Sequence, residues 1–107
     1  MPVQKVLAWS FHSELPLPAM KAKLDSKGPR PWQVGDSDRH GDYLGGTVSP
    51  EGVARIYQVE EGFVVNLKFL SMDGDATAQL ERATGRVLQD VLPAVGARDV
   101  KPTSPVE

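Results

Sequence analysis

Apolar and polar residues alternate along several segments of the chain, and this alternation predicts a β-sheet. Between residues 3 and 12, Leu7, Trp9 and Phe11 occupy every second position, which is typical of a strand with one face in the core. Segments rich in β-branched and aromatic residues also favour strands. The sequence predicts further strands at 32–34, 43–48, 53–59 and 63–70, and an edge strand at 98–101.

The two strands that flank residues 60–62 are predicted to form a hairpin. A three-residue hairpin loop favours glycine at its last position, and Gly62 occupies that position in this chain. This loop places Arg55 opposite Leu67, on the same core side as Tyr57. Because a buried arginine requires a carboxylate, we expect Arg55 to pair with an aspartate of the polar segment 36–43. The alternative is that Arg55 lies at the end of its strand and extends to water.

Two segments have the apolar spacing of amphipathic helices. The first begins at Pro18, whose missing N–H is tolerated in a first turn, and ends before Gly28. The second spans 76–91 and is ended by Pro93 and Gly96. The side chains predicted to be buried in these strands and helices are Leu7, Trp9, Phe11, Ile56, Tyr57, Val65, Leu67, Phe69, Leu80, Val87, Leu88 and Val91.

These elements predict an α+β domain with a mainly antiparallel sheet and two helices packed on one face. Their order is β-α-β-β-β-β-α, with a final strand as an option, and a ferredoxin-like arrangement is the nearest familiar architecture. The length of 107 residues is that of one domain. We expect this domain to span 1–101 and a flexible tail to span 102–107.

Composition and charge argue against several classes of partner. The chain has 12 Lys and Arg against 14 Asp and Glu, and its net charge of −2 creates no positive field for nucleic acid or anionic lipid. It has no cysteine, which fits a reducing compartment. No secretory leader or membrane-spanning run is recognisable. We therefore expect a soluble, cytoplasmic protein that binds neither nucleic acid nor membranes.

The densest group of ionisable side chains lies in the polar segment 36–43, between apolar neighbours. Carboxylates this close together repel one another unless an arginine, a proton, a metal or backbone N–H groups stabilise them. The segment is therefore either a polar turn or a functional site. Its candidate residues are Asp36, Asp38, Arg39, His40, Asp42 and Tyr43.

A metal site is not indicated in this segment. Asp36, Asp38 and Gly41 match the first, third and sixth positions of a calcium-binding EF-hand loop. The twelfth position requires glutamate, and Thr47 occupies it instead. The chain's two histidines supply few imidazole ligands for a transition metal. We expect neither a metal nor a cofactor.

These features favour a small protein-interaction or ligand-binding module. We expect the turn at 36–43 to form its recognition surface together with Trp32, Tyr43 and Arg55, because Trp, Tyr and Arg are enriched among binding hot spots. The partner would be a protein or a small ligand, and a homodimer is one option.

Two alternatives remain open. One is a small hydrolase or lyase in which Asp38 or Asp42 orients His40 for proton transfer, although no nucleophile or cofactor motif accompanies these residues. The other, by analogy with small, acidic, cysteine-free proteins, is a bacterial toxin-neutralising protein whose partner presents a basic surface.

Overall fold

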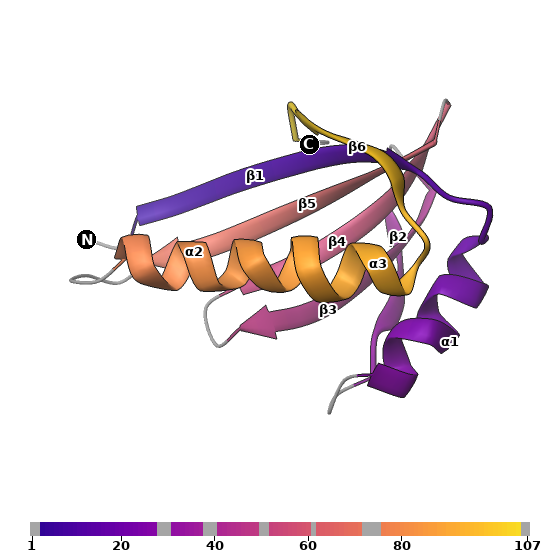
Figure 1. The fold of residues 1–107 in the computed structure, drawn as a ribbon, viewed down its shortest axis with the longest axis horizontal. Coiled ribbons are helices and arrows are strands. Elements are labelled where there is room, and N and C mark those ends of the chain that lie inside the picture. Colours follow the sequence, from indigo (N-terminus) through magenta and orange to yellow (C-terminus); the bar gives the residue numbers. More distant parts are fainter. Residues whose placement is uncertain are drawn as a thin grey trace.

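The order of strands and helices agrees with the prediction from the sequence. The computed structural model of the chain describes residues 3–27, 31–37, 41–49, 52–60, 62–71 and 76–105. Along the chain, the elements are β1 (Val3–His12), α1 (Leu17–Lys27), β2 (Gln33–Ser37), β3 (Gly41–Ser49), β4 (Gly52–Val59), β5 (Gly62–Ser71), α2 (Ala76–Arg86), the π-helical segment η1 (Val87–Val91), α3 (Leu92–Ala94) and β6 (Arg98–Thr103) (Figure 1).

The strands form one six-stranded sheet in the order β2-β3-β4-β5-β1-β6. Every pair of neighbours is antiparallel, so the predicted α+β class is confirmed. The elements α2, η1 and α3 follow one another without a break and form one long helix. This helix connects β5 to β6, and β1 lies between these two strands in the sheet. The ferredoxin-like unit has two strands between its helices, whereas this chain has four. The likeness is therefore limited to the β5–helix–β6 connection, whose two strands are separated by β1 in the sheet.

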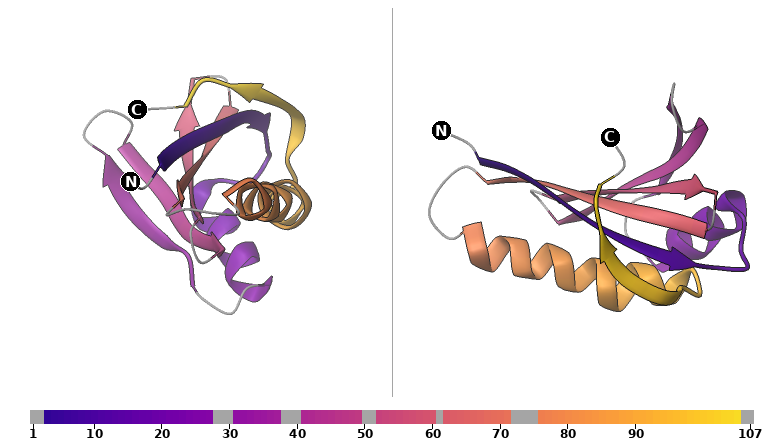
Figure 2. Two further views of the ribbon diagram at one scale, coloured as in Figure 1. Left: turned by 90° about the vertical axis from the view of Figure 1, so that its left-hand side faces the viewer. Right: turned by 90° about the horizontal axis from the view of Figure 1, so that it is seen from above.

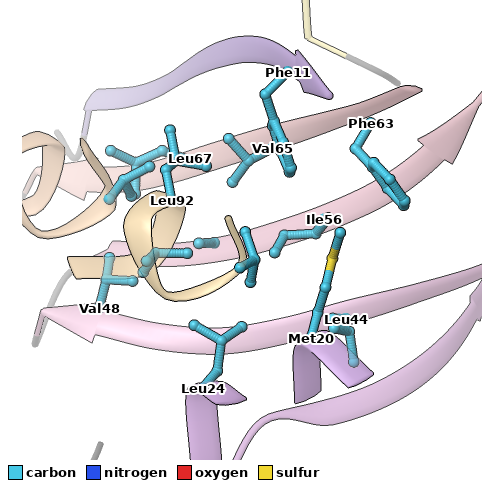
Figure 3. Packing of buried hydrophobic residues seen from close by; sticks show 14 of the residues in the cluster. Phe11, Met20, Leu24, Leu44, Val48, Ile56, Phe63, Val65, Leu67 and Leu92 are labelled. Carbon is cyan, nitrogen blue, oxygen red and sulfur yellow. The ribbon is translucent and has the colours of Figure 1, made fainter. Parts of the chain in front are cut away.

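Both helices pack against the same face of the curved sheet (Figures 1 and 2). From α1, Leu17, Met20 and Leu24 face the core, as their spacing predicts. Figure 3 shows side chains of the two helices meeting those of the central strands. The buried cluster also contains Trp9, Phe11, Trp32, Leu44, Val48, Ala54, Ile56, Phe63, Val65, Leu67, Ala83, Val87, Val91, Leu92 and Val95.

The β4–β5 hairpin differs from the prediction by one residue in register. Val59 pairs with Gly62, so the connection has two residues, and Arg55 pairs with Asn66 rather than Leu67. Gly62 belongs to the ladder through its pairing with Val59, and its φ of +135° is a conformation that glycine tolerates. A one-residue shift reverses the faces of one strand relative to the other. Ile56 thus faces the helices, whereas Arg55 lies on the other side of the sheet.

The long helix is confirmed, but its buried face is narrower than predicted. Val87 and Val91 are buried, whereas Leu88 is 39% exposed, so its predicted burial is wrong. Successive residues in a helix are about 100° apart, which turns Leu88 away from the sheet. The π-helical segment leads into α3, which contains Pro93, and the missing N–H of this proline cannot join a regular helical ladder.

The helix ends after Pro93 in a Schellman motif. The Ala97 N–H donates to the Leu92 carbonyl at 3.0 Å, and the Gly96 N–H donates to the Pro93 carbonyl at 3.1 Å. Gly96 has φ +68°, the left-handed conformation that this motif requires. Gly96 therefore ends the helix as predicted, and Pro93 lies inside its last turn.

The remaining core predictions have mixed outcomes. Trp9, Phe11, Ile56, Tyr57 and the other predicted residues described as buried are confirmed, and Leu7 is partly buried against the core. The side chains of Phe69 and Leu80 lie outside the described set. Within the described residues, no helix is long and apolar enough to cross a membrane.

The edge strand β6 extends further than predicted. Pro102 pairs with Trp9 and Thr103 pairs with Ala8, so both residues belong to the sheet and not to the tail. Proline is tolerated here because only one side of an edge strand needs backbone donors. Proline on an edge also discourages pairing with another chain.

Candidate binding face of the sheet

The second face of the sheet is formed by the alternate residues that point away from the helices. We call it the helix-free face, because none of the described helices covers it. Because neighbouring strands are in register, these residues form rows across the sheet. One row consists of Gly35, Tyr43, Tyr57, Val64, Ser10 and Lys101. The next consists of Gln33, Gly45, Arg55, Asn66, Ala8 and Thr103.

The centre of this face is buried although the described elements place no helix over it. Tyr57 is 1% exposed and Asn66 is 8% exposed. Ala8 and Val64 are also buried, and none of these four residues belongs to the hydrophobic cluster beneath the helices. An antiparallel sheet face without helices is ordinarily polar and solvated. A buried aromatic and a buried amide at its centre therefore distinguish this face from an ordinary solvated one.

Tyr43 lies beside Tyr57 in a position that Gly35 makes possible. The two rings are 5.3 Å apart between centroids and inclined by 38°. A Cβ at Gly35 would overlap the Tyr43 ring, and one at Gly45 would lie 3.5 Å from it. The small residues of β2 and β3 thus give the ring a place directly against the backbone, which limits its conformational freedom.

Arg55 completes the cluster from β4. Its guanidinium carbon lies over the Tyr43 ring, 4.9 Å from the centroid. A cation–π contact at an exposed site is worth about 0.5–1 kcal/mol. The side chain is exposed, so Arg55, Tyr43 and Tyr57 form an ordered cationic and aromatic cluster that solvent reaches from the arginine side.

Most of the described charges on this face are positive. Its strand positions carry Arg55, Lys68 and Lys101, all exposed. Arg98, at the end of β6, lies 3.8 Å from the Glu14 carboxylate. Apart from Asp99 in the irregular part of β6, the described strand positions on this face carry no carboxylate. The face is thus cationic in a chain whose net charge is −2.

The structure places Trp32 in the core and not on the surface. It is 6% exposed, and its indole lies against Gly46, where a Cβ would approach the ring to less than 3.0 Å. Gly46 therefore makes room for the Trp32 ring on the helix side of β3. Because Trp32 is buried, its ring is not an exposed anchor for a partner.

An aspartate of α1 holds the backbone of Trp32. The Trp32 N–H donates to Asp25 Oδ1 at 2.6 Å, and Lys21 Nζ donates to Asp25 Oδ2 at 2.5 Å. The hydrogen bond from Lys21, followed by that from the Trp32 backbone, lowers the pKa of Asp25 below its ordinary value of 3.8. This contact joins the helix to the start of β2.

The predicted polar turn connects two paired strands, as expected. Asp36 of β2 pairs directly with Asp42 of β3, and both side chains are exposed. Strand alternation places them on the helix side of the sheet, whereas Tyr43 and Arg55 lie on the other side. The register therefore does not favour the predicted pairing of Arg55 with either aspartate.

The rest of the turn lies outside the described residues. Asp38, Arg39 and His40 belong to this part, so the acid–base arrangement around His40 stays a prediction. Among the described residues, no group of three or more potential metal-ligating side chains is present.

Of the predicted binding residues, the structure brings Tyr43 and Arg55 together. The face also contains Tyr57, Asn66, Lys68 and Lys101, which were not predicted as site residues. The alternation of β4 and β5 contained the necessary signal, but the incorrect hairpin register assigned Tyr57 to the core face. No protein-family model, curated protein or solved structure matches this chain.

Proposed function

We propose that the protein is a small binding module whose recognition surface is the helix-free face of the sheet. The observation that carries this proposal is the ordered cluster of Arg55 over Tyr43, beside the buried Tyr57. Tyrosine and arginine are the residue types that most often supply binding energy in interfaces, together with tryptophan.

The packing of Tyr43 on Gly35 supports the same proposal. A side chain already held in place loses little conformational entropy when a partner binds, so more of the contact energy is retained as affinity. The exposed Val53 lies on the same face, where it pairs with Lys68 and extends the surface beyond Arg55. Apolar, aromatic and cationic groups thus occur together on one side of the sheet.

A pair of matched double variants tests the proposal. Arg55→Ser with Val53→Ser alters the helix-free face, while Arg82→Ser with Leu88→Ser alters the outer side of the long helix. Each pair removes one exposed arginine and one exposed aliphatic side chain; Val53 is 40% exposed and Leu88 39%. Partners are captured from an extract of the source organism, and folding is checked by thermal melting.

The proposal predicts that the helix variant captures the same partners as the wild type and that the sheet variant loses them while remaining folded. Equal capture by both variants would contradict it. Loss in the helix variant alone would place the recognition surface on the other side of the molecule.

A further inference from the structure

We propose that the outer edge of β2 binds an extended segment of a partner protein, which adds a strand to the sheet and places a lysine or arginine beside Asp36. β2 is the first strand in the order of the sheet, so only β3 pairs with it among the described elements. Figure 2 shows β2 as the outermost strand, with no described helix or strand beyond it. The inference adds a second surface to that of the proposed function and does not depend on Arg55.

The two edges of the sheet differ in their protection against a further strand. β6 contains Pro102, which lacks a backbone donor, and Asp99, whose φ of +54° departs from a regular strand. Both features discourage pairing with another chain. β2 (Gln33–Ser37) contains neither proline nor lysine, and none of its described residues has a positive φ. The edge of β2 is therefore the better template for another strand.

Backbone groups of β2 point toward this edge. The Trp32 N–H donates to Asp25 Oδ1 of α1 rather than to a strand. Because the backbone groups of alternate residues point to the same side of a strand, those of Val34 and Asp36 are directed away from β3. Among the described residues, no backbone hydrogen bond joins either residue to an element outside the sheet. An added strand would supply partners for these donors and acceptors.

The side chains along the edge specify the chemistry of the added strand. Val34 is 53% exposed, the largest exposed fraction among the described large hydrophobic residues that face solvent. Asp36 follows two positions later on the same face, and its direct neighbour across the strands is Asp42. Like charges directly opposite each other are unfavourable, and no ion pair to either carboxylate is found within the described part of the chain. An apolar residue beside Val34 and a cation two positions along would complement this edge.

The Tyr43 ring offers a contact on the opposite face of the added strand. Its Cζ, Cε1 and hydroxyl oxygen lie where a Cβ of Gly35 would be. The ring thus extends from β3 across β2 toward the edge. A β-branched side chain beside Gly35 would pack against this ring, since aromatic and β-branched residues form favourable pairs across strands.

A second copy of the chain complements the edge less well. β2 contains one acid and no base, so a copy of β2 brings another carboxylate instead of a cation. The net charge of −2 also disfavours the approach of two identical chains. Charge therefore favours a different, basic strand as the occupant.

The test uses the peptide TKTVTKT with both ends blocked. In a strand, its valine and lysines lie on one face and its threonines on the other. Its order is the same in both directions, so it fits parallel and antiparallel pairing alike. Binding to the whole chain is measured by titration, with backbone amide resonances as the reporter. The peptide TETVTET, in which glutamate replaces lysine, tests the role of charge.

Matched variants of the two edges locate the binding. Val34→Thr with Asp36→Asn alters β2, and Val100→Thr with Asp99→Asn makes the same changes on β6, where both residues are also exposed. Val34→Pro removes an N–H from the edge of β2 and tests the backbone contribution. Urea unfolding checks that each variant is folded.

We expect saturable binding of TKTVTKT, with resonance shifts centred on β2 and β3. The double variant of β2 should bind about tenfold more weakly and that of β6 should change by less than about twofold, since one ion pair and one apolar contact together contribute on this scale. TETVTET should also bind about tenfold more weakly, because its carboxylates meet Asp36. The folded Val34→Pro variant should lose affinity as well.

Several results would overturn the inference. These are the absence of saturable binding, equal binding of TETVTET, equal losses in the two double variants, or full binding by a folded Val34→Pro variant. Self-association of the wild type that the double variant of β2 abolishes would instead assign the edge to a second copy of the chain. None of these results bears on the helix-free face, whose own test changes Arg55 and Val53.

Discussion

The two adjacent glycines of β3 provide a sharp test of the structure, because alanine should have different effects at the two positions. At Gly46, an added Cβ would approach the indole of Trp32 to less than 3.0 Å. At Gly45, it would lie 3.5 Å from the Tyr43 ring and 3.8 Å from Arg55 Cγ, which are ordinary contacts. Both residues belong to the same strand and have backbone conformations outside the left-handed region.

The expected magnitudes follow from these contacts. Carbon atoms pack favourably at about 3.5–4.0 Å, so Gly46→Ala must displace the indole or the strand. The indole is buried, and the Trp32 backbone is held by Asp25; overpacking of this kind costs about 1–3 kcal/mol. Gly45→Ala introduces no overlap and restricts the unfolded chain, so its effect should lie between zero and a gain of about 1 kcal/mol.

Urea unfolding monitored by tryptophan fluorescence measures both effects, because Trp32 reports directly on the perturbed position. A loss of 1 kcal/mol corresponds to a melting temperature lower by roughly 4 °C in a chain of this size. If Gly46→Ala were as stable as the wild type, Trp32 would not pack on β3 as described. Equal losses at both positions would indicate a general intolerance of the strand and would refute the argument from the rings.

The other predictions concern the helices and the core. Gly85→Ala should stabilise the protein by about 1 kcal/mol, since the added Cβ meets no atom within 4 Å and alanine favours a helix; a loss in urea unfolding would contradict this. Leu67→Ala should cost about 2–5 kcal/mol because the side chain is fully buried, whereas Leu88→Ala should change stability by less than about 0.5 kcal/mol, and similar losses would refute the assigned faces. The lowered pKa of Asp25 adds stability that is fully present above pH 3.8 and is lost as the pH falls below it. Asp25→Asn should therefore be less stable than the wild type at neutral pH, with a difference that narrows in acid; a constant difference would contradict the assigned cause.

Much of the fold is predictable because its signals are local. The spacing of Leu17, Met20 and Leu24 determines which face of α1 is buried, and Gly96 marks the end of the long helix. These features depend on residues within one or two turns of each other. Local periodicity therefore places the elements in the correct order along the chain.

The register of the sheet is not determined in this way. Gly62 fits the last position of a three-residue loop and equally the first ladder position after a two-residue one, and the two choices place Tyr57 on opposite faces. The position of Leu88 likewise depends on where the helix meets the sheet. Of the predicted site, Tyr43 and Arg55 come together, but their contact depends on pairing between β3 and β4 that no local signal specifies.

Recognition on the helix-free face can be tested with a single bulky group placed on that face. Because the chain has no cysteine, Val53→Cys and Leu88→Cys each introduce one thiol, at sites 40% and 39% exposed in the parent chain. Each variant is coupled to the same large maleimide, checked for folding, and assayed for capture of the natural partner. The group at residue 53 should block capture and the group at residue 88 should not. Undiminished capture with the group at residue 53 would show that recognition does not occur on this face.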